Sequence, residues 1–147
     1  MSTHISRATA GDLPAILELL AASQLTVEGL TNHVTTTFVA RRQGAIVGTV
    51  TLELYDDCAL LRSLAVKAAA RGQRIGHTLV RECIDLGSRT GIPALYLLTI
   101  TAEEFFPRFG FQRIDRAEVP ASLMRSAEFA YACPPSSIVM RKVLRPV

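Results

Sequence analysis

The hydrophobic residues of the chain recur with two different periods, and each period predicts one kind of element. In residues 9–23, apolar side chains stand at Leu13, Ile16, Leu17 and Leu20, which is the i, i+3, i+4, i+7 spacing of a helix with one buried face. The same spacing returns further along at Ile75, Leu79, Val80, Cys83 and Ile84. Two amphipathic helices are therefore predicted.

Short alternating or continuous apolar runs predict strands between and after these helices. The runs lie at residues 4–8, 36–42, 46–55, 58–66, 94–99, 111–115 and 136–144. The turn QGA joins the second and third runs as a hairpin. The turn DD joins the third run to the fourth, which is expected to pair with it in antiparallel orientation. A short helix or an ordered loop is expected at residues 26–34, and a short helix that breaks around Pro107 and Gly110 at 102–111. A loop and helix are expected within 116–135.

The order of these elements predicts the fold class. A strand–helix–strand unit sits within an otherwise antiparallel run of strands, so the sheet has to be mixed. The class is α/β, in the α+β sense of a mixed, mostly antiparallel central sheet flanked by helices. Residues 1–147 are expected to form a single domain.

Composition agrees with a compact protein, because 49% of the 147 residues are apolar and 20% are charged. No apolar run approaches the ~20 residues of a membrane span. The N-terminus MSTHISRATAGD lacks the basic-then-apolar form of a secretory signal. We therefore expect a cytoplasmic protein with no membrane partner.

A net charge of +3 and a pI near 9.0 favour anionic partners. The arginines are scattered, with no basic block and no interleaved aromatic residues, so no nucleic-acid partner is expected. An anionic small molecule would satisfy the same charge.

The three cysteines, Cys58, Cys83 and Cys133, belong to no CxxC or CxH pattern. Buried free thiols are the first interpretation, and a metal or metalloid site is the alternative. We assign no metal site to them.

The stretch KAAARGQRIGHTLVREC carries two glycines, Gly72 and Gly76, at the start of the second helix, with Arg71 and Arg74 beside them. Backbone N–H groups at a helix start lack intrahelical partners, and glycine lets a phosphate approach them closely. These residues predict a diphosphate cradle. The alternative is a glycine-tolerant helix start packed on the sheet, since neither the P-loop nor the GxGxxG pattern is present.

Two longer stretches, LLRSLAVKAAARGQRIGHTLV and LYLLTITAEEFFPRFGF, closely resemble the central motifs of the GNAT superfamily of N-acetyltransferases. In that family an apolar strand precedes the pattern [QR]xxGx[GA] at a helix start, and a later helix closes in GF. Arg74 stands where the family's first motif glycine is expected. If Arg74 has a helical backbone, its N–H stays available and the cradle survives.

The resemblance implies that acetyl-CoA lies between the strands LRSLAV and LYLLT, which splay apart. Its pantetheine arm is expected on the backbone of Leu64 and Val66, and its diphosphate on the amides from Arg71 to His77. The implied acetyl-CoA contacts are Leu64, Ala65, Val66, Arg71, Gly72, Gln73, Arg74, Ile75, Gly76, His77 and Phe106. Phe106 takes the place of a tyrosine acid that many family members keep, so another acid or none is expected.

Within the superfamily, the C-terminal half resembles the acetyltransferase domain of N-acetylglutamate synthase and small stand-alone relatives encoded with arsenic-resistance genes. The segments EFFPRFGF, DRAEVP and SAEFAYACPPSSIVMRKVL carry this resemblance. It implies a link to arsenic resistance. Thr101 stands where the synthase's arginine is expected, so glutamate itself is not assigned as the acceptor.

Glu53, in the strand segment LELY, is the candidate base that takes a proton from the acceptor amine. Alternation with Leu52 and Leu54 leaves an outward-facing side chain as the alternative. Tyr55 is the candidate orienter or acid, and a simple strand aromatic is its alternative.

Arg62 is the candidate specificity residue, because a charge within an apolar strand needs a partner and an acceptor carboxylate would pair with it. By period 2 it shares a face with Leu64 and Val66. A structural ion pair with Glu53 or Asp57 is the alternative.

Three further residues are assigned to the acceptor site through the resemblance: Glu28, His33 and Thr101. The first two fall in residues 26–34, which form a wall of that site in the superfamily. Surface positions are the alternative for both.

The sequence thus predicts an acetyl-CoA-dependent N-acetyltransferase acting on the primary amine of a small, anionic amino acid or amino-acid-like compound. The alternative is a catalytically inactive acyl-CoA-binding sensor or scaffold, which Phe106 favours. Dimers are frequent in this superfamily, and the apolar composition allows a homodimer.

Overall fold

In the computed structural model, which describes residues 2–144, the strands form a seven-stranded sheet. The strands are β1 (His4–Arg7), β2 (Thr37–Arg42), β3 (Ala45–Leu54), β4 (Ala59–Val66), β5 (Ala94–Thr99), β6 (Gln112–Ile114) and β7 (Ile138–Val143). Their order is β1-β2-β3-β4-β5-β7-β6, and all neighbours are antiparallel except β4 and β5. The predicted mixed, mostly antiparallel sheet is confirmed.

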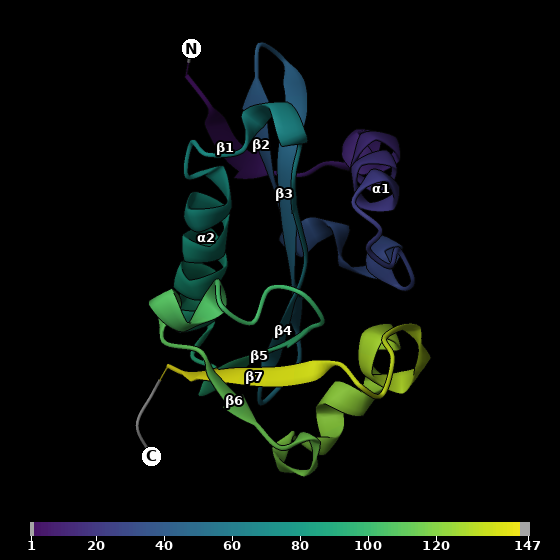
Figure 1. Cartoon of the computed structure of the whole chain (residues 1–147), viewed down its shortest axis with the longest axis vertical. Helices are drawn as coiled ribbons and strands as arrows, with labels where there is room; N and C mark the ends of the chain where they lie inside the picture. Colours follow the sequence, from purple (N-terminus) through teal and green to yellow (C-terminus); the bar gives the residue numbers. More distant parts are fainter. Residues whose placement is uncertain (1, 145–147) are drawn as a thin grey trace.

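Two longer helices cover opposite faces of the β1–β4 part of the sheet (Figure 1). On one face, α1 (Leu13–Ala22) buries Ile16 and Leu20 against a core that includes Val39. On the other face, α2 (Ile75–Thr90) packs its apolar stripe against β3 and β4, and it ends at Gly91 with φ 82°. Helix α1 lies within the predicted residues 9–23, and α2 begins beside Gly76, where the start of the second helix was predicted.

The remaining helical segments are short. The 3-10 segments are Ala10–Asp12, Leu30–Thr36, Ala68–Ala70, Phe106–Phe109, Arg116–Glu118 and Ala121–Arg125, and a π-helical turn spans Glu128–Ala132. The short helix predicted for residues 102–111, with a break around Pro107 and Gly110, forms as a single 3-10 turn that ends before Gly110. Pro107 lacks an N–H for a longer helix, and Gly110 at φ 94° ends the turn.

A β-bulge interrupts β4 at Ser63, whose φ is 62°. Thr51 pairs with Arg62 and Thr49 with Ala65, so two residues of β4 face one residue of β3. The bulge reverses the alternation of side chains along the strand. The prediction that Arg62 shares a face with Leu64 and Val66 is therefore wrong: those two side chains pack in the α2 core, whereas Arg62 contacts the segment after α1.

The parallel strands β4 and β5 pair only at Ala59 with Leu95 and at Leu60 with Tyr96. Beyond these pairs the strands diverge, and their backbone N–H and C=O groups no longer meet. The predicted splay between the two strands is confirmed. This divergence is the feature that opens the candidate site.

Candidate active site

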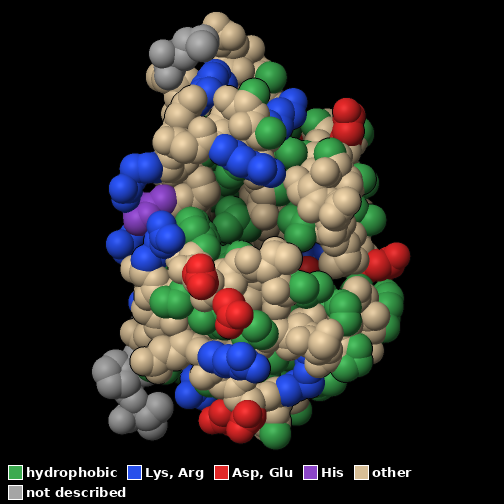
Figure 2. Space-filling view, in the orientation of Figure 1, with side chains coloured by type: hydrophobic (Ala, Val, Ile, Leu, Met, Phe, Trp, Pro, Cys, Tyr) green, Lys and Arg blue, Asp and Glu red, His purple; other side chains and the backbone are tan. Residues whose placement is uncertain are grey.

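A cavity of about 940 Å³ lies where β4 and β5 diverge. Its walls come from residues 61–66 of β4, residues 97–102, the start of α2, residues 23–26, and the segment 128–137. Figure 2 shows this face hollowed near its centre, with hydrophobic side chains in the hollow and Lys and Arg side chains along one side of it. One end of the cavity is thus basic, and its middle is apolar.

The basic end is the start of α2. Gly72 has φ +83°, and a Cβ there would meet nothing within 4 Å, so the backbone is open to a ligand. A Cβ on Gly76 would stand 3.8 Å from both Val66 and Phe105. The first N–H groups of the helix have no intrahelical partner. These features fit a diphosphate.

Three arginines add positive charge to this end, and they line the cavity at Arg71, Arg74 and Arg108. His77 also lines it, but its pKa is lowered by partial desolvation and by the nearby positive arginines, so the imidazole is neutral at pH 7. The field that a polyanion would meet comes from the arginines and from the helix dipole.

The other implied acetyl-CoA residues differ in how they face the cavity. Leu64 and Phe106 line it, and Phe106 is buried. Val66 lines it, but its carbonyl already accepts a hydrogen bond from Arg71 Nε at 3.2 Å. Ala65 and Ile75 also line it, although Ala65 packs in the α1 core and Ile75 is buried in the α2 core. The side chain of Gln73 bonds to Arg42 instead of lining the cavity.

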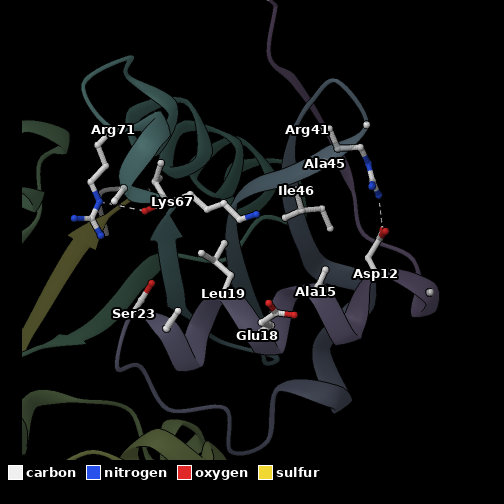
Figure 3. Close-up of a pocket in the computed structure, with 15 residues that line it drawn as sticks. Asp12, Ala15, Glu18, Leu19, Ser23, Arg41, Ala45, Ile46, Lys67 and Arg71 are labelled. Carbon is white, nitrogen blue, oxygen red and sulfur yellow. Dashed lines mark hydrogen bonds and ion pairs between the residues drawn. The ribbon is translucent and has the colours of Figure 1, made fainter.

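A second cavity of about 500 Å³ lies between α1 and the β2–β3 hairpin (Figure 3). The ion pair between Arg41 and Asp12, 2.6 Å between Nη2 and Oδ2, stands at its wall. Ser23, Val66 and Arg71 line both cavities. Arg71 therefore stands at the boundary between them.

At the opposite end of the main cavity, Arg62 is the centre of a buried charged cluster and is 2% exposed. Its Nη1 donates to Glu53 Oε2 at 2.9 Å and to the Glu28 carbonyl at 2.7 Å. Its Nη2 donates to the Thr26 carbonyl at 3.3 Å, and its Nε to Ser63 Oγ at 2.9 Å. Four of the five guanidinium N–H groups are thus used within the protein.

Glu53 is 1% exposed and does not line the cavity. Arg62 holds one of its oxygens, and the Tyr55 hydroxyl donates to the other at 2.6 Å. Burial, reinforced by this carboxylate, raises the pKa of Tyr55, so the hydroxyl keeps its proton. The outward-facing alternative is wrong, and the structure contains the alternative ion pair between Arg62 and Glu53.

Glu128 is a further site residue that the sequence did not reveal. It lies in the π-helical turn, is 6% exposed, lines the cavity and approaches Arg62 Nε with Oε2 at 3.3 Å. Burial raises its pKa to about 7, Glu53 adds to the rise, and Arg62 opposes it. The one signal in the sequence is an acidic residue within the mostly apolar run AEFAYA.

The remaining acceptor-site candidates lie around this cluster. The side chain of Glu28 is exposed, and it is its backbone carbonyl that meets Arg62. His33 is half-buried with Nε2 3.7 Å from Glu53 Oε1, and burial lowers its pKa. Neither residue lines the cavity, whereas Thr101 is exposed and does.

A model of the acetyltransferase (GNAT) domain matches residues 33–113, which is more than half of the chain. The chain belongs to the GNAT acetyltransferase family. An amino-acid acetyltransferase of Mycobacterium tuberculosis is 30% identical over 129 residues, covering 81% of this chain and 74% of the relative. An uncharacterised N-acetyltransferase of Chlorobaculum tepidum is 31% identical over 100 residues, covering 67% of this chain and 64% of the relative.

Solved GNAT structures share the whole architecture. N-acetylglutamate synthase from Neisseria gonorrhoeae, complexed with coenzyme A and N-acetyl-glutamate, superposes with a TM-score of 0.83 at 24% identity. The match covers 99% of this chain and 36% of the synthase chain. A Mycobacterium tuberculosis protein in complex with CoA and a second ligand superposes with a TM-score of 0.82 at 28% identity. This match covers 97% of this chain and 99% of the other chain. This GNAT chain thus spans about a third of the synthase.

The GNAT motif explains the backbone of Arg74. This residue replaces the first motif glycine and adopts the left-handed conformation, φ 63° and ψ 21°, as the N-cap of α2. The condition that Arg74 be helical is therefore not met. Glycine adopts the left-handed conformation without strain, whereas Arg74 bears strain at this N-cap.

Replacing Arg74 by glycine is expected to raise the free energy of unfolding by about 1 kcal/mol. The left-handed conformation costs a residue with a side chain ~1–2 kcal/mol, and the greater backbone entropy of glycine in the unfolded chain offsets part of this gain. The matched control is Ala69→Gly in the preceding 3-10 turn, which relieves no strain and is expected to lose ~0.5–1 kcal/mol. Urea denaturation measures both. A loss of stability in Arg74→Gly would mean that the contacts of its side chain with His77 outweigh the strain.

The cysteines lie apart. Cys58 and Cys83 are buried, Cys133 is half-buried, and all three thiols are free. Within residues 2–144, His, Cys, Asp and Glu side chains form no group of three or more that could hold a metal ion. Burial raises the pKa of Cys133 to about 11, so this thiol is protonated at pH 7.

Among residues 2–144, no helix is both long and apolar enough to cross a membrane.

Proposed function

We propose that this GNAT chain transfers an acetyl group from acetyl-CoA to the primary amine of a small amino acid or amino-acid-like compound. The observation that carries the proposal is the cavity between β4 and β5, which joins a positively charged helix start to a buried charged cluster. The first end suits a diphosphate, and the second is polar enough to receive an acceptor.

Acetyl-CoA is the proposed acetyl donor. The N–H groups from Gly72 to His77 would hold its diphosphate, since the Arg71 N–H already donates to the Ala68 carbonyl at 3.3 Å. The open edges of β4 and β5 would hold the pantetheine arm. Because the Val66 carbonyl already accepts from Arg71, the backbone of Leu64 is the better partner for that arm. The coenzyme A in the Mycobacterium tuberculosis and synthase structures supports this assignment.

The chemistry needs a stabilised oxyanion and a leaving thiolate. The N–H of Leu64, next to the bulge, is the proposed donor to the thioester oxygen. Phe106 carries no proton to give, and a thiol pKa of about 8.5 makes thiolate a fair leaving group without an acid. Phe106 thus accords with an active enzyme as well as with a sensor.

An amino acid is the proposed acceptor because the amino-acid acetyltransferase of Mycobacterium tuberculosis is similar over 81% of this chain. The net charge of +3 favours an anionic one. Four N–H groups of Arg62 are already bonded within the protein, so the acceptor carboxylate is assigned to the exposed wall residue Thr101. A cytoplasmic location, a homodimer and the link to arsenic resistance stay predictions.

Thiol release from acetyl-CoA tests the function, with a correction for the protein's own three cysteines. The acceptors are glutamate, aspartate, glutamine, the other amino acids and methylamine, and acetyl-CoA binding is measured in parallel by calorimetry. Turnover restricted to amino acids would support the proposal. Binding of acetyl-CoA without turnover of any amine would favour the sensor. Absence of acetyl-CoA binding would mean that the start of α2 is a glycine-tolerant helix start that holds no diphosphate.

A further inference from the structure

We propose that Glu128 binds the ammonium group of the acceptor and takes the proton that the amine must lose before it attacks acetyl-CoA. This inference rests on the proposed acetyltransferase function and assigns the base and the anchor of the acceptor. Three observations support it: where the carboxylate lies, the charge balance around it, and its nearness to the bulge in β4.

The position of Glu128 sets it apart from Glu53. Both carboxylates are buried and both contact Arg62, but only Glu128 lines the cavity. Glu53 has one oxygen held by Arg62 and the other by Tyr55, so neither is open to an acceptor. The role of base that the sequence assigned to Glu53 therefore moves to Glu128.

The charges around Glu128 do not balance within the protein. Arg62 supplies one positive charge, whereas Glu53 and Glu128 supply two negative charges when both are ionised. His33 adds none, because burial lowers its pKa, and the thiol of Cys133 beside Glu128 stays neutral. One buried cation cannot neutralise two buried carboxylates, so Glu128 either holds a proton or pairs with a second cation that enters the cavity.

These two states are the two states of a general base. With its pKa near 7, Glu128 is matched to a reaction at neutral pH. An ammonium group beside it would supply the missing positive charge and would favour the ionised carboxylate. A proton then passes over a short distance between two groups that are both partly desolvated.

Glu128 also lies close to the reacting end of the cavity. Arg62 Nε contacts both Glu128 Oε2 at 3.3 Å and Ser63 Oγ at 2.9 Å, so the carboxylate is one side chain away from the bulge. The N–H of Leu64, proposed to meet the thioester oxygen, follows directly in the chain. An amine held at Glu128 would thus stand beside the acetyl group.

The acceptor enters as R–NH3⁺ and gives one proton to the Glu128 carboxylate. The nitrogen lone pair forms the C–N bond with the thioester carbonyl carbon, and the C–S bond breaks to release the CoA thiolate. The thiolate takes the second proton from nitrogen, which leaves an amide and free CoA, and Glu128 returns its proton to water.

Steady-state kinetics of Glu128→Gln test the proposal, with Glu104→Gln, on an exposed residue outside the cavity lining, as the matched control. In Glu128→Gln, kcat/KM at pH 7 is expected to fall at least about 100-fold. Its acetyl-CoA affinity should stay within about twofold, and its pH profile should lose the acidic limb near the pKa of Glu128. Glu128→Asp should recover part of the rate, and Glu104→Gln should match the wild type.

A second measurement needs no turnover. In protein with ¹³C-labelled glutamate side chains, NMR titration of Glu128 is run with saturating methylammonium chloride and with sodium chloride of equal ionic strength. The pKa of Glu128 is expected to fall in methylammonium only. This response in a protein that acetylates no amine would keep the cation site and refute the acetyltransferase function. Wild-type kcat/KM and pH profile in Glu128→Gln, or an unresponsive Glu128, would overturn the proposal.

Discussion

Replacing Arg62 by methionine is expected to lower the free energy of unfolding by about 3–5 kcal/mol, because it leaves buried carboxylates without their cation. Arg62 is 2% exposed, and its guanidinium pairs with both Glu53 and Glu128. It also donates to two backbone carbonyls of the segment after α1, at Thr26 and Glu28. Methionine keeps most of the volume, so the loss reports the charge and the hydrogen bonds. Urea denaturation followed by circular dichroism measures it.

The control for Arg62→Met is Arg113→Met, which removes an exposed arginine whose ion pair with Glu103 spans 4.0 Å. That change is expected to cost less than about 0.5 kcal/mol. In the double variant Arg62→Met, Glu53→Gln, part of the loss should return, because one stranded charge is gone. A stable Arg62→Met protein that binds acetyl-CoA but has lost only acceptor affinity would restore Arg62 to acceptor recognition.

Replacing Glu128 by glutamine is expected to stabilise the protein at pH 8 by about 3 kcal/mol and to leave it nearly unchanged at pH 4.5. Burial raises the pKa of Glu128 from 4.5 to about 7. Below pH 4.5 the carboxyl is protonated in both states; as the pH rises to 7 the unfolded chain ionises first and stability is lost. At 1.36 kcal/mol per pKa unit, the loss of stability amounts to about 3 kcal/mol. Glutamine does not ionise, so the variant does not lose this stability.

Unfolding free energies of both proteins between pH 4.5 and 8.5 measure this difference, with Glu104→Gln as the exposed control. The two curves are expected to separate as the pH rises and to run parallel above pH 7.5. Curves that coincide at every pH would place the pKa of Glu128 at its ordinary value. A stabilised Glu128→Gln protein would also show that its loss of activity is not caused by unfolding.

The parts of the fold that could be predicted are those with a local cause. The limits of β5 agree with the run ALYLLT, because continuous apolar residues between a Pro and polar residues allow little else. The bulge at Ser63 has no such cause. It arises from the pairing of β4 with β3, and a serine at positive φ leaves no mark in the sequence.

The basic end of the site was predictable and the charged end was not. Glycines and arginines beside an amphipathic stripe indicate a helix start for an anion, whatever the rest of the fold does. Glu128 is different, since its burial depends on a π-helical turn packed against a strand some sixty residues earlier in the chain. Only the tertiary structure shows that Arg62 and Tyr55 hold both oxygens of Glu53, whereas Glu128 lines the cavity.

The way Arg62 holds the segment after α1 bears on how acceptor range can change. Its contacts there are with the carbonyl oxygens of Thr26 and Glu28, which every amino acid supplies. Side chains at these positions can therefore be exchanged while the anchor that fixes their backbone stays the same. For library design, this makes residues 25–28 a region to diversify, and it makes Arg62 and Gly29, at φ 75°, the positions to keep unchanged.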